Sequence, residues 1–473
     1  MEYFLNLEFI KFDIIAAISD VLWTYIVITM LVGCALYFTW NLRGVQFTML
    51  PTMLRNLFKP SDQPIESIGK RKISSFQAFA ISLSSRVGTG NLAGVASAIF
   101  VGGPGAVFWM WVSALFGMAT KFAEIALAME YREQDPQGSY RGGVMYILSR
   151  GMKNKTLGKL LGSAFAAFCT MVALVSCNAV QSNSIAEALR VSFPDVHPAF
   201  WGAALALIVG LVIFGGIRKI AAVTSLLTPL MAGMYLLLGT VIIIFNFDRI
   251  PDAFRMIFVS AFSGDAVVGG VAGATMLHAM RMGVARGIFS NEAGCGSSPL
   301  IHVTARVDVP TRQALYGVVE VFVDTIVVCT FTALIVLTSG IWNSGETGVA
   351  LSNLAWKGTL GSFGDAVLTA SLILFGISTI LGWAWYGETA AEFLFGVRAI
   401  LPYRLIHLAF TFLGAVTAVS VMWNAADFCN GLMVLPNLLS LWLFAPQISN
   451  ITQAFFARPE FAGKSSPPRA QRS

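Results

Sequence analysis

The chain has 473 residues, of which 56% are hydrophobic and only 12% are charged. Soluble globular proteins carry about 25% charged residues, so this composition, with a mean hydropathy of +0.72, excludes a soluble domain and predicts a polytopic membrane protein. The net charge of +6 comes from basic residues in the connections between apolar segments, and we therefore expect no nucleic-acid partner.

The cysteines and histidines do not indicate a metal centre. No two of the six cysteines form a CxxC pair, and most lie in apolar runs, where a thiol behaves as a small hydrophobe. The four histidines lie far apart with no HxxxH spacing. A membrane-embedded enzyme would need a base, a nucleophile and a metal site at the same depth in the bilayer. The sequence shows no such set, so we expect that the protein is not an enzyme.

Apolar runs of about 17 to 25 residues, bounded by charge, proline or glycine, predict about eleven membrane-spanning segments. The start of the chain, up to Asp20, is acidic and lacks a small-residue cleavage pattern, so we expect no removable signal peptide. The predicted spans lie near residues 20–40, 74–100, 105–130, 160–189, 200–216, 220–246, 265–290, 313–339, 364–391, 404–422 and 428–456.

The distribution of positive charge predicts the orientation in the membrane. If the connections alternate between the two sides, most of the 31 Lys and Arg residues fall on one side. The positive-inside rule makes that side the cytoplasm. This places the N-terminus outside and the C-terminus in the cytoplasm of a bacterial-type cytoplasmic (inner) membrane, with lipid around the spans.

The first span stands apart, because a basic connection from Asn41 to Ile73 separates it from the other spans. The remaining spans divide into two groups of five, and an odd number of crossings inverts the second group relative to the first. The predicted fold is an all-α polytopic membrane protein with a five-plus-five inverted repeat, discontinuous leading helices and one extra N-terminal helix. The corresponding units are residues 1–73, 74–246, 247–456 and the cytoplasmic tail 457–473.

The leading span of the first group is interrupted by a polar, glycine-rich segment, RVGTGN at residues 86–91, near the expected bilayer midplane. A helix break exposes N–H groups that attract a carboxylate and carbonyls that attract a cation. We expect the N–H groups of Thr89 to Asn91 to bind a substrate carboxylate, and carbonyls near Ser84 and Val87 to bind a cation. The alternative is a plain glycine kink that permits tight helix packing.

The leading span of the second group should break in the same way. Its C-terminal half, residues 283–294, contains several glycines. We expect the interruption at Gly283 and Gly287, with both glycines next to the substrate.

Three further positions in apolar spans are candidates for the site. Gln181 offers a donor and an acceptor to an amino acid, although it could equally serve a helix–helix hydrogen bond. Ser378 and Thr379 offer hydroxyl oxygens, which suit a hard cation such as Na⁺, but such hydroxyls often bond the carbonyl one turn before them. Trp383 lies one turn further along, where its ring could wall a pocket or simply pack.

Charged residues inside apolar spans usually pair and are often functional. Lys121 and Glu124 are three residues apart, which predicts a local pair on one helix. Arg86 and Arg286 each lie beside a predicted break. We expect each to form an ion pair that gates or braces the break, with a carboxylate that the sequence does not identify.

Several long motifs are specific when taken together: RVGTGNLAGVA (86–96), GGPGAVFWMW (102–111), GMATKFAE (117–124), QSNSIA (181–186), RGIFSNEAG (286–294), Gly382-Trp383 with YGE (386–388), and Trp423-Asn424 with NGLM (430–433). With these motifs the chain, from about residue 75 to residue 446, resembles the alanine or glycine:cation symporter family. The resemblance implies an inverted repeat like that of the neurotransmitter sodium symporters, with an additional N-terminal helix.

The same resemblance implies roles for individual residues. Thr89 and Gly90 would bind the substrate carboxylate, and Thr89, Gln181 and Trp383 would surround the amino acid. Two positions depart from the family pattern: Cys177 stands where glycine is common, which could narrow the pocket, and Cys295 stands where methionine is common. The sodium ligands implied are Ser84, Val87, Ser378 and Thr379.

The sequence therefore predicts a symporter that moves a small neutral amino acid, alanine or glycine, into the cell with Na⁺ by alternating access. H⁺ as a coupling ion and the choice among glycine, L-alanine and D-alanine stay open. The alternative is a cation channel, because VGTG at residues 87–90 is similar to a potassium filter. A filter needs four copies around an axis, whereas this chain carries the motif once.

Overall fold

The computed structural model describes residues 18–19, 21–57, 73–134, 140–262, 267–268, 271–272, 276–307 and 309–458. Residues 58–72 of the predicted basic connection and nearly all of the predicted cytoplasmic tail lie outside these residues. Within the described residues the helices are joined by turns and loops, and the β-structure is an isolated bridge between Ile73 and Ala305 and two short antiparallel hairpins, β1–β2 (Glu133–Gln134 with Tyr140–Arg141) and β3–β4 (Val267–Val268 with Val271–Ala272).

Eight helices among the described residues are long and apolar enough to cross a membrane. This confirms the prediction of an all-α polytopic membrane protein. They are η1–α2 (Leu22–Val27, Ile28–Asn41), α7 (Gly105–Glu130), α9–η4–α10 (Lys155–Leu174, Val175–Ala179, Val180–Ser192), α12 (Gly216–Phe245), α16–η6–α17 (Pro310–Val321, Phe322–Cys329, Thr330–Thr338), α18 (Gly348–Phe395), η7–α19 (Val397–Ala399, Ile400–Val416) and α20 (Val419–Leu443).

The other predicted spans correspond to shorter or interrupted helices. They are α5 (Ser75–Arg86) with η3 (Gly90–Gly94) and α6 (Val95–Gly102), α11 (Pro198–Ile213), and α14 (Met276–Asn291). Short helices lie between or beside the spans: α3 (Val45–Thr48), α4 (Leu50–Leu57), α8 (Val144–Gly151), η5 (Phe247–Arg249), α13 (Ile250–Phe262), α15 (Pro299–His302) and α21 (Ala445–Phe456).

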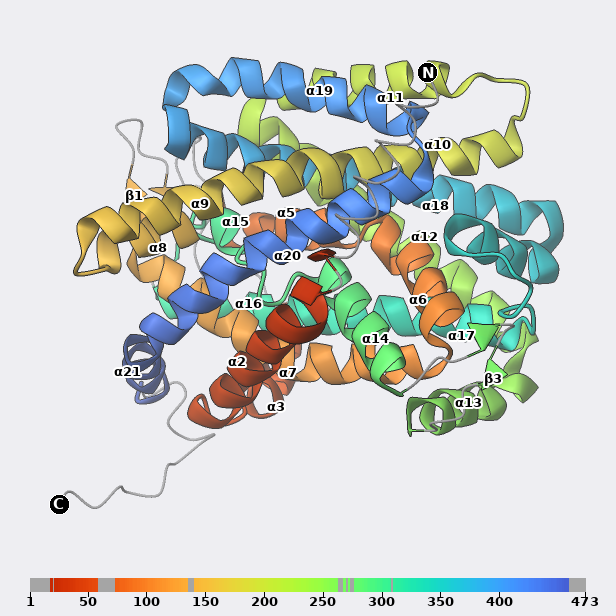
Figure 1. Cartoon of the computed structure of the whole chain (residues 1–473), viewed down its shortest axis with the longest axis horizontal. Helices are drawn as coiled ribbons and strands as arrows, with labels where there is room; N and C mark the ends of the chain where they lie inside the picture. The colour runs from red at the N-terminus through yellow and green to blue at the C-terminus, as the bar shows by residue number, and fades with distance from the viewer. Residues whose placement is uncertain are drawn as a thin grey trace.

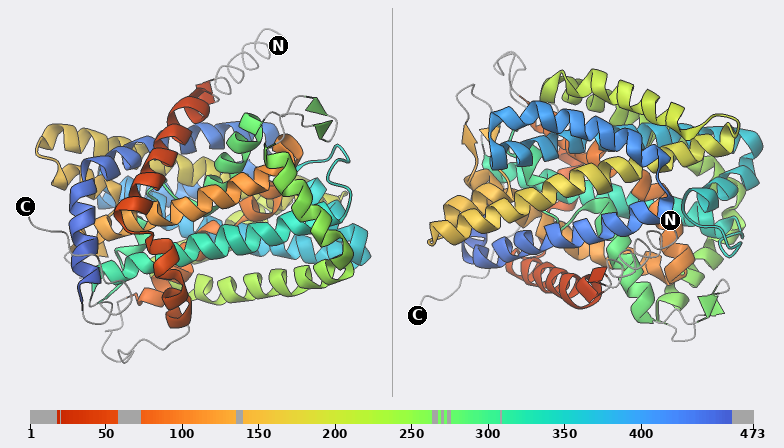
Figure 2. Two further views of the ribbon diagram at one scale, coloured as in Figure 1. Left: turned by 90° about the horizontal axis from the view of Figure 1, so that it is seen from below. Right: turned by 45° about the horizontal axis from the view of Figure 1, so that its top comes forward.

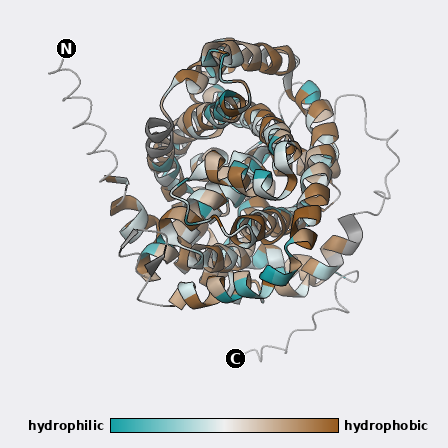
Figure 3. Cartoon of the chain, turned by 90° about the vertical axis from the view of Figure 1, so that its right-hand side faces the viewer, coloured by the Kyte–Doolittle hydropathy of each residue, from teal (hydrophilic) through white to brown (hydrophobic). Residues whose placement is uncertain are grey.

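The helices form one elongated bundle, with the long axes of α7, α9 and α20 running in roughly the same direction (Figure 1). Figure 3 shows many of them close to end-on, with hydrophobic residues on the outside of the bundle as well as between helices. The first helix, η1–α2, lies on the outside of the bundle, where it packs against α7 (Figure 2). Exposed apolar residues are expected where a protein faces lipid rather than water.

The first leading helix begins and breaks where its sequence predicts. Ser74 starts α5 with a capping box, because its hydroxyl accepts from the Gln77 N–H while the Gln77 side chain accepts from the Ser74 N–H. The helix ends at Arg86, and Val87 has a non-helical ψ of 85°. The interruption thus falls at residues 87–89, before η3.

The prediction for the second leading helix is wrong in position. Helix α14 continues through Gly283 and Gly287 and ends at Asn291. The interruption follows it, where Glu292 has a φ of 54°, and α15 then begins at Pro299. The predicted start near residue 265 is also wrong, since β3 and β4 precede the helix.

The two glycines of α14 serve close helix packing instead of a break. A Cβ atom on Gly283 would lie 2.2 Å from the backbone oxygen of Ala106, and one on Gly287 would lie 2.8 Å from the Ser113 hydroxyl. Both contacts are with α7. Glycine at these positions therefore allows the backbones of α14 and α7 to approach.

Candidate functional site

In the first helix break, backbone N–H groups and one hydroxyl donate hydrogen bonds to side-chain oxygens. The Thr89 N–H and the Thr89 hydroxyl both donate to Oε1 of Gln181, at 3.0 and 2.8 Å. The Gly88 N–H donates to Oδ1 of Asn91 at 2.9 Å. All of these residues are buried, so the break satisfies its polar groups with protein atoms at a depth where water is scarce.

Glycine is needed in the break because side chains from other helices approach it. A Cβ atom on Gly88 would lie 2.5 Å from Oγ1 of Thr379 and 3.1 Å from Oε1 of Gln181. On Gly90 it would lie 2.9 Å from the ring of Phe289. The break is therefore the place where α10, α14 and α18 converge on the backbone of the first leading helix.

The predicted cation ligands are also brought together. The Ser378 hydroxyl donates to the Ser84 carbonyl at 2.9 Å, and the Thr379 hydroxyl lies 3.5 Å from the same oxygen. Val87 directly follows the last residue of α5. The Ser84 hydroxyl instead donates to the Ile81 carbonyl of its own helix, so any contribution of Ser84 to a cation site comes from its backbone oxygen.

A network of buried charges links the two helix interruptions. Arg86 pairs with Glu320 of α16 and, at 3.3 Å, with Glu292 in the second interruption. His302 lies 2.8 Å from Glu320 and 2.8 Å from the side chain of Gln313. The carboxylates are compensated by cations and hydrogen bonds, as low-dielectric burial requires.

Lys121 has more partners than the local pair that the sequence predicts. Its Nζ lies 3.5 Å from Glu124, one turn along α7. It also donates to the Glu292 carbonyl and, at 2.6 Å, to the Ser298 hydroxyl. Because Ser298 is a partner of Arg86 too, Lys121 joins α7 to the same network.

A second polar cluster surrounds Asp324, which is buried in the wide helical turns of η6. Its carboxylate accepts from the side chains of Asn91 at 2.8 Å, Ser290 at 2.7 Å and Thr325 at 2.9 Å. These donors come from both leading helices and from η6. The side chain of Asn91 is therefore committed to Asp324 and to Gly88, so only its backbone remains for the predicted carboxylate role.

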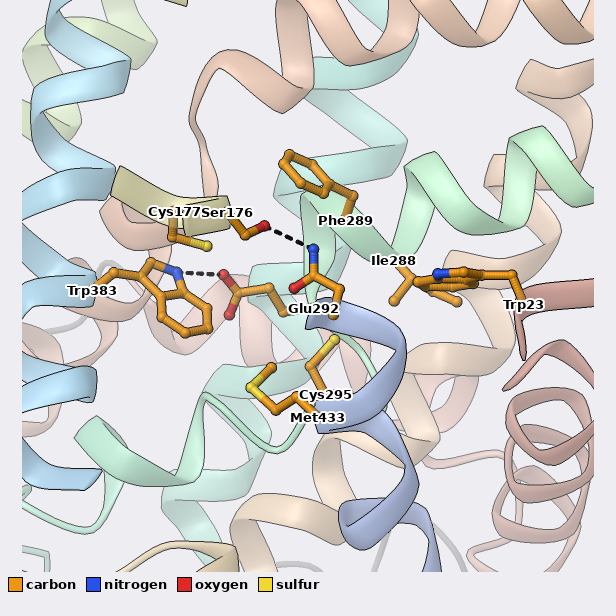
Figure 4. Close-up of a pocket in the computed structure, with 10 residues that line it drawn as sticks. Trp23, Ser176, Cys177, Ile288, Phe289, Glu292, Cys295, Trp383 and Met433 are labelled. Atoms are coloured by element: carbon orange, nitrogen blue, oxygen red, sulfur yellow. Dashed lines mark hydrogen bonds between the residues drawn. The ribbon is translucent and has the colours of Figure 1, made fainter. Parts of the chain in front are cut away.

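A small cavity lies beside Phe289, whose ring also approaches Gly90 of the helix break (Figure 4). Its volume of about 10 Å³ holds roughly one water molecule. Trp383 donates its indole N–H to Glu292 at 2.9 Å on one side of this space, and Trp23 and Ile288 lie on the other (Figure 4). The lining residues are Trp23, Ser176, Cys177, Ile288, Phe289, Glu292, Cys295, Trp383, Asn430 and Met433.

The structure brings together at the first helix break the predicted residues Thr89, Gln181, Ser84, Ser378 and Thr379, and none of these five lines the cavity. Trp383 lines the cavity, and the departures from the family pattern, Cys177 and Cys295, line it as well. Gly283 and Gly287 are not part of this cluster, because they pack against α7.

Sequence reasoning missed most of the cavity wall, because, of the ten lining residues, it singled out only Cys177, Cys295 and Trp383 as individual positions. Glu292 could have been found as a carboxylate in a glycine-rich segment after an apolar span. Trp23 gives no comparable signal, because an aromatic residue near a span end is usual.

The fold and the buried polar site define a class of protein, the polytopic membrane transporters. Solved structures support the fold: the chain superimposes on a manganese transporter of Eremococcus coleocola with a TM-score of 0.50 and 14% identity, covering 86% of this chain and 82% of that one. The sodium:alanine symporter family matches residues 8–467, and the chain belongs to this family.

Individual relatives agree with this membership. The sodium/alanine symporter AgcS of Methanococcus maripaludis is 40% identical over 94% of this chain and 97% of its own length. An uncharacterized transporter of Haemophilus influenzae is also 40% identical, over 94% of this chain and 96% of its own length. The probable sodium/glutamine symporter GlnT of Bacillus subtilis is 36% identical over 95% of this chain and 92% of its own length. The chain is accordingly a multi-pass membrane protein and a sodium-coupled amino-acid symporter.

Proposed function

We propose that the protein moves alanine or glycine into the cell together with Na⁺, by alternating access. One observation carries the proposal: two donors of Thr89 converge on the single amide oxygen of Gln181 in a buried helix break. A substrate carboxylate oxygen is chemically suited to replace that amide oxygen, since both accept hydrogen bonds from the same groups. The freed amide of Gln181 can then bind the amino acid.

The cation site in this proposal uses the Ser84 carbonyl with the hydroxyls of Ser378 and Thr379, and the carbonyl of Val87. The short separation between the Ser378 hydroxyl and the Ser84 carbonyl supports it. A hydroxyl that now donates to this carbonyl can rotate, so that both oxygens face a hard cation. Inward movement of one Na⁺ releases roughly 2.3 kcal/mol of free energy per 100 mV of membrane potential. Tenfold accumulation of an amino acid requires about 1.4 kcal/mol, so the sodium gradient can drive it.

Alternating access is supported by what encloses the site. The cavity of about 10 Å³ is too small for an amino acid, so side chains or helices must move before one binds. In the proposed topology, with the N-terminus outside a bacterial cytoplasmic membrane, the Arg86 network lies on the cytoplasmic side of the break. The bidentate pair of Arg286 with Asp427, at 2.8 Å for both contacts, lies on the outer side.

We assign the moving parts to two inverted repeats, residues 74–246 and 247–456, which follow the first helix. The first repeat starts with an interrupted helix, α5 with η3 and α6. In the second, the interrupted helix α14 with α15 follows η5, α13 and the β3–β4 hairpin. This correspondence supports a pseudo-twofold relation of the kind that many secondary transporters use.

The test is uptake by proteoliposomes that contain the purified protein. Labelled glycine, L-alanine and D-alanine are supplied under an inward Na⁺ gradient, an inward H⁺ gradient, or neither. We expect uptake of at least one of these amino acids only with the Na⁺ gradient. Uptake driven by H⁺ alone would reject sodium coupling, and cation flux without any amino acid would favour the channel alternative.

A further inference from the structure

The first helix, which precedes both proposed repeats, reaches the cavity beside the helix break. Of the ten described residues that line the cavity, Trp23 is the one from this helix. Its side chain is buried, whereas Trp40 at the other end of the same helix is 88% exposed. The burial of Trp23 therefore reflects a specific position against the site.

Close contact with α20 holds the Trp23 ring in place. Its indole N–H donates to the Asp427 carbonyl at 2.8 Å. A Cβ atom on Gly431, one turn further along α20, would lie 2.7 Å from Leu22 and 3.2 Å from Nε1 of Trp23. Glycine at this position lets the first helix come near enough for the ring to reach the cavity.

The residue that anchors Trp23 is tied to the substrate-binding region by a second contact. The Asp427 carboxylate forms the bidentate pair with Arg286 of α14. Arg286 lies one turn before Phe289, which contacts Gly90 in the break and lines the cavity. Asp427 consequently links the first helix, α20 and α14 at one point.

The position of Trp23 in the cavity is opposite the predicted substrate contact Trp383. Figure 4 shows the two indoles on opposite sides, with Glu292 between them. Two rings at fixed positions limit the width of the space that remains. Because Trp23 is buried and hydrogen-bonded at its indole N–H, it is less free to move aside than an unanchored side chain.

We infer that Trp23 is a specificity-determining residue, which closes the transport cavity on the side opposite Trp383 and sets the largest side chain that the protein accepts. The inference rests on the proposed amino-acid site and extends it. The first helix then acts as a wall of the binding site as well as a packing element. An enlarged cavity should accept larger neutral amino acids, since hydrophobic pockets discriminate by about 10- to 200-fold per methylene.

The experiment compares Trp23→Ala and Trp23→Phe with the wild-type protein in proteoliposomes. For each protein, inhibition of labelled alanine uptake by unlabelled glutamine and leucine is measured, and the inhibition constant is divided by the KM for alanine. We expect this ratio to fall at least about tenfold in Trp23→Ala, and less in Trp23→Phe. Trp40→Ala, on the exposed face of the same helix, is the matched control and should keep the wild-type ratio.

A purely structural role for Trp23 would lower uptake of every amino acid without changing the ratio, and that result would overturn the inference. If Trp23→Ala does not fold, the result for Trp23→Phe decides: a lowered ratio supports the inference, and an unchanged ratio rejects it. Failure of the proposed function itself would be seen separately, as absence of alanine and glycine uptake by the wild-type protein.

Discussion

Arg86, the last residue of α5, forms an ion pair with Glu292, the first residue after α14, with 3.3 Å between Nε and Oε2. The pair joins the ends of the two interrupted helices. Glu292 also accepts from Trp383 of α18, so its carboxylate connects α5 and α18 to the end of α14. A movement of α14 relative to α5 must break or rebuild these contacts, and we expect conformational change to be concentrated there.

Gln181→Ala should weaken binding of alanine more than binding of Na⁺. The substitution removes the Gln181 amide, which the proposal frees from Thr89 to bind the charged amino acid. A hydrogen bond to a charged group is worth about 1.5–3 kcal/mol, which corresponds to roughly a tenfold or greater rise in the KM for alanine. Uptake at varied alanine and Na⁺ concentrations measures both effects. Gln453→Ala, at an exposed position of α21, is the control. An equal loss of apparent alanine and Na⁺ affinity would contradict the role of Gln181.

Thr379→Ala should raise the Na⁺ concentration required for half-maximal uptake, because one proposed ligand oxygen is removed while the α18 backbone is kept. The matched control is Thr389→Ala on the same helix, since the Thr389 hydroxyl donates to the Trp385 carbonyl of its own helix, at 2.9 Å. Sodium dependence is measured at saturating alanine. A Thr379 variant with the sodium dependence of the wild type would remove this residue from the cation site.

Glu320→Gln should destabilise the folded protein strongly. The substitution leaves Arg86 with one fewer carboxylate partner inside the bundle, and breaking a buried pair from one side costs about 3–5 kcal/mol. The measurement is the melting temperature of the protein in detergent. Glu133→Gln, which removes the more exposed pair with Arg150, serves for comparison and should cost no more than about 1 kcal/mol. Similar melting temperatures for the two variants would show that the buried network contributes little to stability.

Gly283→Ala should reduce stability without a specific change in alanine KM. The new methyl group would collide with the Ala106 backbone, and overpacking of this kind costs about 1–3 kcal/mol. Gly233→Ala in α12 meets no atom within 4 Å and should be neutral or slightly stabilising. If Gly283→Ala instead raised the alanine KM of normally stable protein, Gly283 would belong to the substrate site after all.

Local sequence determined much of this protein. The long apolar runs required membrane-spanning helices, because backbone polar groups must be satisfied within lipid. Polar residues and glycines at 86–91 required an interruption of the first leading helix. Gln181, Ser378 and Thr379 stood out for a similar reason, since polar side chains in apolar spans are costly unless they face protein.

Only the tertiary structure decided which residues meet. Glycines that permit a break and glycines that permit close packing have the same local signature, and only the approach of α7 assigns Gly283 and Gly287 to packing. In the same way, the sequence could not pair Arg86 with Glu292 or bring Trp23 to the cavity. These contacts join residues that are distant in the chain, so they depend on how whole helices pack and not on any local pattern.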